Sequence, residues 1–93
     1  MMNSEIIIER LAADADGRVF KVSVIEGGER SDYVVSLTEE FFGKIGKGRS
    51  AEELVKKSFE FLLEREPKEL ILKSFDISDI SDHFPEFDRE ISE

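Results

Sequence analysis

Residues 18–25 read RVFKVSVI, and the order of their side chains predicts a half-buried β-strand. Phe20, Val22 and Val24 fall on one face of such a strand, whereas a lysine and a serine fall on the other. This alternation indicates a sheet with one face turned toward a hydrophobic core.

Two further segments extend the pattern on either side. Residues 5–11 (EIIIERL) are rich in β-branched side chains and are separated from residues 18–25 by the turn sequence DADG at residues 14–17. Residues 32–37 (DYVVSL) follow a second turn, EGGE, at residues 26–29. Because short turns join antiparallel neighbours, we expect a three-stranded antiparallel β-meander.

Two helices are predicted after these strands. Thr38, followed by two glutamates, is typical of a helix start, and the glycines from Gly43 onward keep that helix short. Ser50 and Glu53 form a capping-box pattern that predicts a longer helix over residues 51–65. The apolar positions of that helix share one face: Val55, Phe59, Leu62 and Leu63.

The C-terminal third carries weaker signals. Pro67 ends the long helix or opens another, and residues 70–72 (LIL) are short enough to be strand or helix; we expect helix. In residues 76–93, Asp76 and Pro85 each begin one or two predicted helical turns. The apolar anchors of this segment are Ile77, Ile80, Phe84, Phe87 and Ile91.

The expected fold follows from these elements. We predict an α+β fold in which the three-stranded meander packs against one main amphipathic helix, with short C-terminal helices. Residues 1–93 form a single small domain in this prediction, because no composition break or repeat divides them. The apolar anchors predict that the acidic tail, residues 76–93, docks on the core.

The net charge and the apolar residues of the second sheet face indicate which partners the chain can bind. The formal net charge is −9, and residues 76–93 contribute −6 of it through seven acids and one arginine. This balance disfavours nucleic acid and favours a basic protein partner. Ile7, Ile25 and Val34 make the second sheet face partly apolar, which leaves a homodimer open.

The sequence offers no catalytic residues and predicts no enzyme. It contains no cysteine and a single histidine, His83, so no nucleophile and base can be paired and no multi-histidine metal site can form. We therefore expect no cofactor and no metal. The lack of cysteine fits a cytoplasmic location, and no apolar run of membrane-spanning length occurs in residues 1–93.

The basic link, residues 43–50 (GKIGKGRS), is the one candidate binding segment. Backbone amides at the helix start of Ser50, beside Lys44, Lys47 and Arg49, could hold a phosphate or a nucleic-acid backbone. The other interpretation is a flexible link whose charges are solvated.

Three resemblances accompany these patterns. Residues 32–37 (DYVVSL) followed by residues 50–54 (SAEEL) resemble HicB-type antitoxins over residues 19–65, which implies a sheet-and-helix domain that neutralises a basic ribonuclease toxin. Residues 43–46 (GKIG) resemble the GxxG loop of KH-type RNA-binding domains. Residues 74–91 are similar to the ends of short conserved prokaryotic proteins of uncharacterised function.

The sequence therefore favours a non-enzymatic protein-interaction or accessory module. Two alternatives stay open. One is an antitoxin-like partner of a basic toxin, and the other is KH-like binding of RNA or a phosphate ligand through residues 43–50.

Overall fold

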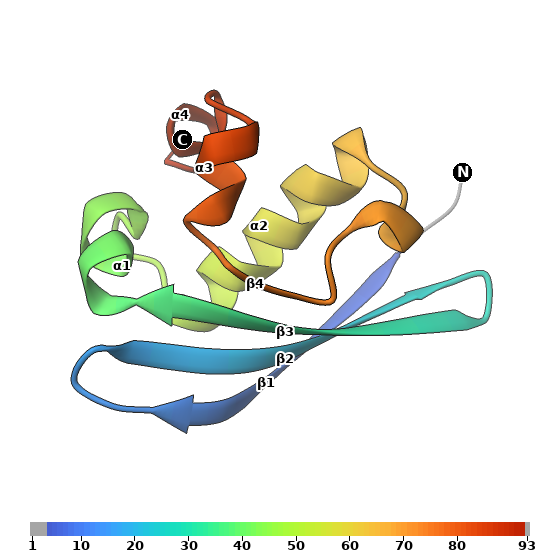
Figure 1. Ribbon diagram of the computed structural model, residues 1–93, viewed down its shortest axis with the longest axis horizontal. Coiled ribbons are helices and arrows are strands. Elements are labelled where there is room, and N and C mark those ends of the chain that lie inside the picture. Colours follow the sequence, from blue (N-terminus) through green and yellow to red (C-terminus); the bar gives the residue numbers. More distant parts are fainter. Residues whose placement is uncertain (1–3, 93) are drawn as a thin grey trace.

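A computed structural model describes residues 4–92; residues 1–3 and 93, at the ends of the predicted domain, lie outside the described residues. The sheet forms one layer and the helices lie together on one of its faces (Figure 1). The element order is β1 (Glu5–Ala13), β2 (Gly17–Glu26), β3 (Glu29–Thr38), α1 (Glu39–Ile45), α2 (Ala51–Arg65), η1 (Lys68–Leu70), β4 (Ser74–Asp76), α3 (Asp79–His83) and α4 (Phe87–Ile91).

The first three strands pair antiparallel, as predicted, through two tight turns. Asp14 accepts hydrogen bonds from the amides of Asp16 and Gly17 in the first turn, at 2.8 and 3.1 Å. In the second turn Gly27 and Gly28 have φ angles of 57° and 85°, which the hairpin geometry requires and glycine adopts at little cost.

The sheet nevertheless has four strands, in the order β1-β2-β3-β4, and β4 runs parallel to β3. The prediction of a three-stranded, purely antiparallel sheet was therefore incomplete. The expected helix at residues 70–72 was also wrong beyond its first residue. One 3-10 turn ends at Leu70, and the chain then extends into β4, because Phe75 pairs with Val35 and packs against the core.

Both predicted helix starts are present. The Thr38 hydroxyl accepts from the amide of Phe41 at 3.1 Å, and the Ser50 hydroxyl accepts from the amide of Glu53 at 3.1 Å. Lys47 and Gly48, with φ angles of 52° and 82°, turn the chain between α1 and α2. The α+β class is confirmed.

The core lies between α2 and one sheet face. The sheet contributes fully buried side chains from β2 and β3: Phe20, Val22, Val24, Tyr33, Val35 and Leu37. The Phe59 ring of α2 lies 5.2 Å from the Tyr33 ring and 5.9 Å from the Phe75 ring, measured between centroids. Phe59 thus joins the helix to two neighbouring strands.

We expect Phe59→Ala to lower the free energy of unfolding by about 3–5 kcal/mol, because it removes this buried ring and leaves a cavity. The measurement is urea denaturation followed by circular dichroism. Lys57→Ala, on the exposed side of α2, is the matched control and should change stability by less than about 0.5 kcal/mol.

Phe59→Leu, which keeps an apolar side chain, should fall between these two values and covers the case in which the alanine variant does not fold. A Phe59→Ala protein as stable as the Lys57→Ala control would contradict this packing.

Candidate functional site

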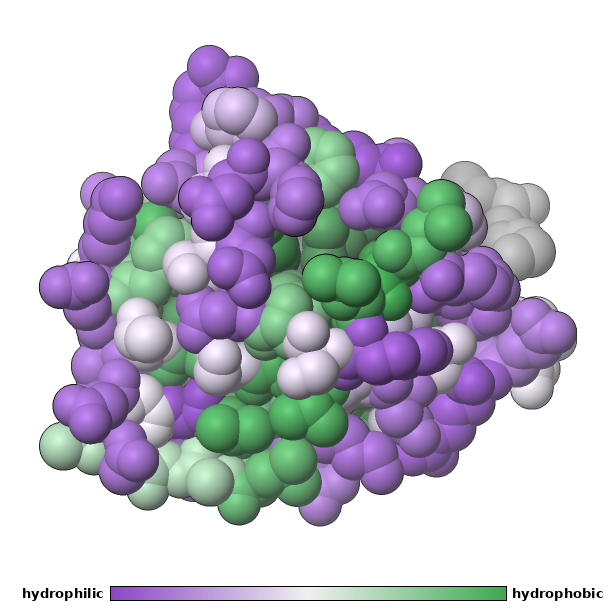
Figure 2. All heavy atoms as spheres, in the orientation of Figure 1, coloured by the Kyte–Doolittle hydropathy of each residue, from purple (hydrophilic) through white to green (hydrophobic). Residues whose placement is uncertain are grey.

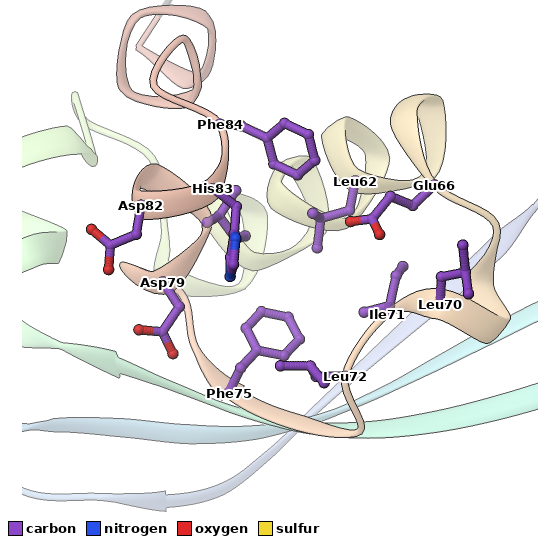
Figure 3. A pocket seen from close by; sticks show the side chains of 11 residues that line it. Leu62, Glu66, Leu70, Ile71, Leu72, Phe75, Asp79, Asp82, His83 and Phe84 are labelled. Carbon is purple, nitrogen blue, oxygen red and sulfur yellow. The ribbon is translucent and has the colours of Figure 1, made fainter.

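A groove of about 500 Å³ opens between the C-terminal half of α2, residues 70–75 and α3. In Figure 3, Leu72 and Phe75 border it from below, Phe84 borders it from above, and Leu62 lies behind. The volume falls within the range of roughly 300–1,000 Å³ that is usual for binding pockets. The groove is the candidate site of this protein.

The lining of the groove is mainly apolar. Leu62, Ile71 and Ile80 are buried at its base, whereas Leu70 and Leu72 are 66% and 65% exposed. These two leucines are the most exposed large apolar side chains among residues 4–92. Figure 2 shows hydrophobic side chains gathered over the segment between η1 and β4, beside a hollow in the surface. Leu70 and Leu72 therefore leave apolar surface exposed to solvent beside the groove.

The rim of the groove is acidic. Glu66, Asp79 and Asp82 belong to the lining, and none of its eleven residues is Lys or Arg. Within residues 4–92, none of these three carboxylates forms an ion pair with a cation. His83 points from α3 toward Phe75 (Figure 3). The rim therefore favours positive charge beside the apolar surface.

The connecting segment, residues 67–73, is anchored through Lys68. The Tyr33 hydroxyl donates to the Lys68 carbonyl at 2.6 Å, and the Lys68 ammonium, whose side chain is 5% exposed, pairs with Glu69 at 2.8 Å and Glu29 at 3.3 Å. The Glu69 hydrogen bond, assisted by Glu29, raises the pKa of Lys68 despite its burial. Burial raises the pKa of Tyr33. These bonds hold the segment that presents Leu70 and Leu72.

β4 fixes the floor of the groove. The Lys73 carbonyl accepts from the Val34 amide at 2.8 Å, and the Ile77 amide donates to the Ser36 carbonyl at 2.9 Å. Burial of Asp76 works against its charged form, yet the hydroxyls of Ser36 and Ser78 donate to the carboxylate and lower its pKa.

The wall formed by α3 is held in place by the following helix, α4. The Arg65 guanidinium bonds Glu86 at 3.3 Å and Glu90 at 3.0 Å, and it stacks 3.6 Å from the centre of the Phe61 ring. The Phe61 ring also meets Phe87, with 5.0 Å between centroids. Arg65 thus forms ion pairs with the C-terminal tail, whereas the neighbouring Glu66 lines the groove.

The basic link predicted as a binding segment lies against the tail. Lys44 pairs with Asp88 at 3.7 Å, Arg49 donates to the Ile91 carbonyl at 2.7 Å, and Ser50 caps α2. Lys47 is exposed at the turn. The structure brings these four residues to one end of the molecule, where Lys44 and Arg49 serve to position α4.

The GKIG segment that resembles a KH loop begins inside α1. Gly43, Lys44 and Ile45 belong to the last turn of that helix, and the Ile45 side chain is buried in the core. A loop that lies along a nucleic-acid backbone would instead be exposed between two helices.

The open face of the sheet is mixed in character. Ile7 and Val34 are 43% and 41% exposed, but a polar cluster lies between them. Ser23 donates to Asp32 at 2.7 Å and Arg30 bonds the same carboxylate at 2.9 Å. The Ser23 hydrogen bond, followed by Arg30, lowers the pKa of Asp32.

In the described part of the chain, no group of three or more His, Cys, Asp or Glu could hold a metal ion. The sequence analysis did not predict this groove. The one pattern that could have indicated it is the isolated apolar run LIL at residues 70–72, which is bounded by a proline and by polar residues. Ile71 of this run is buried in the core, whereas Leu70 and Leu72 face solvent.

Tyr33 is the only tyrosine, so its ionisation reports directly on the anchored segment. We expect the ultraviolet absorbance of tyrosinate in the folded protein to titrate at a higher pH than in the urea-denatured chain. Because the pKa of Tyr33 is raised in the folded protein, burial of the neutral side chain stabilises the fold fully below the pKa of the unfolded chain, near 10. This stabilisation is lost as the pH rises through the higher pKa of the folded protein. The pKa of Lys68 is also raised, so its contribution to stability is likewise lost as the pH rises through the pKa of the folded protein. Coincident titrations of the folded and denatured chains would contradict the buried Tyr33 contact.

Comparisons with protein-family models, with curated proteins and with solved structures found no match for this chain. None of the helices within residues 4–92 is long and apolar enough to cross a lipid bilayer.

Proposed function

We propose that this chain is a non-enzymatic protein-interaction module that binds a segment of another protein in the groove. The observation that carries the proposal is the combination of two exposed leucines with an acidic rim. Burial of apolar side chains supplies affinity, at roughly 25 cal/mol per Å² removed from water. Charge at the rim selects the partner and its orientation.

The partner segment carries large apolar side chains flanked by Lys or Arg. The net charge of −9 repels acidic proteins and nucleic acid, and no cation among residues 4–92 forms an ion pair with the carboxylate of Glu66, Asp79 or Asp82. An antitoxin-like role, suggested by the resemblance over residues 19–65, belongs to the same proposal, because the toxin in that family is also basic.

The proposal is tested by selecting peptides from a random library displayed on phage against the immobilised protein. We expect the enriched sequences to contain at least two large apolar residues flanked by Lys or Arg. The double variant Leu70→Asp/Leu72→Asp should weaken their binding at least tenfold, because it removes the apolar contacts and adds like charge to the rim. Affinities are measured by calorimetry with the synthesised peptides.

Leu11→Asp is the matched control, since Leu11 is an exposed apolar residue on β1, at the edge of the sheet opposite to β4. It should leave the affinity unchanged. A selection without enrichment, or peptides that bind the double variant as tightly as the unchanged chain, would overturn the proposal.

A further inference from the structure

The edge of the sheet next to the groove is poorly suited to receiving an added strand. β4 has only three residues. The Asp76 amide, which points away from β3, already donates to the Asp79 carboxylate at 3.1 Å. Strand addition depends on a row of free backbone groups, so β4 offers little to an extended peptide.

The rim charges lie on opposite sides of the groove. Glu66, which follows α2, points into the groove from one side, whereas Asp79 and Asp82 of α3 lie on the other side with their carboxylates on the outer edge of the rim (Figure 3). In an extended peptide, alternate side chains point into the groove and directly away from it. Its cations would then point away from the groove and not sideways toward the carboxylates on its two sides. In a helix, the residues next to an apolar stripe project sideways in both directions.

We propose that the partner segment binds as a short amphipathic helix whose apolar stripe lies in the groove and whose flanking Lys or Arg residues meet the two sides of the rim. This inference depends on the proposed function and specifies its ligand. Apolar residues at i, i+3 or i+4, and i+7 contact the groove between Leu70, Leu72 and Phe84. Because isolated helices this short are marginal in water, the segment becomes helical on binding.

Two synthetic dodecamers of identical composition test the binding mode. LKKLLKKLLKKL places its leucines on one helical face, whereas LKLKLKLKLKLK places them on one face of a strand. Each is titrated into the isotope-labelled protein at concentrations where the peptide is monomeric, and amide chemical shifts are followed. We expect the helix-patterned peptide to shift residues 70–72 and 79–84, to bind at least tenfold more tightly, and to gain helical circular dichroism.

Further controls test the role of the acidic rim and the role of the two exposed leucines separately. The acidic peptide LEELLEELLEEL should bind at least tenfold more weakly than its lysine counterpart, because its charges oppose the rim. Leu70→Asp/Leu72→Asp should abolish the shifts, and Leu11→Asp, at another exposed leucine, should preserve them.

Equal or tighter binding of the strand-patterned peptide in the groove would overturn the helical mode and leave the proposed function intact. Binding of the acidic peptide at equal strength would overturn the role of the rim. If neither lysine peptide shifts the groove residues, the helical mode fails, and the phage selection decides independently whether the groove binds any peptide.

Discussion

The Phe59 ring packs on both the Tyr33 and the Phe75 rings, and these aromatic contacts determine how the other elements are placed. It fixes α2 on the sheet through β3, and it holds the short strand β4 through Phe75. A three-residue parallel strand contributes few hydrogen bonds, so this apolar packing supplies much of what keeps β4 in place.

The groove follows from the same packing. Phe75 packs on Phe59 and also lines the groove, so the floor of the candidate site is continuous with the core. Lys68, bonded by Tyr33, sets where the connecting segment leaves α2 and therefore where Leu70 and Leu72 are presented. The ion pairs of Arg65 with the tail complete the opposite wall. The acidic rim and the overall negative charge then determine which partners can approach.

Sequence patterns predicted the elements that have strong local signals. Alternation defined β2 and β3, and the hydroxyl caps at Thr38 and Ser50 located both helix starts. β4 was missed because three residues are too few to show alternation, and because a parallel pairing depends on Val35, 40 positions earlier in the chain. The groove was missed for a related reason. The LIL run at residues 70–72 is too short to show which side chains face the core, so the exposure of Leu70 and Leu72 is visible only in the structure.

The most direct measurement of the central contact is the nuclear Overhauser effect between aromatic side chains in the isotope-labelled protein. We expect cross-peaks from the Phe59 ring protons to those of both Tyr33 and Phe75, whose ring centroids lie 5.2 and 5.9 Å from that of Phe59. Cross-peaks to Tyr33 without any to Phe75 would contradict the packing of β4 and of the groove floor on the core. The absence of both would contradict the docking of α2 on the sheet.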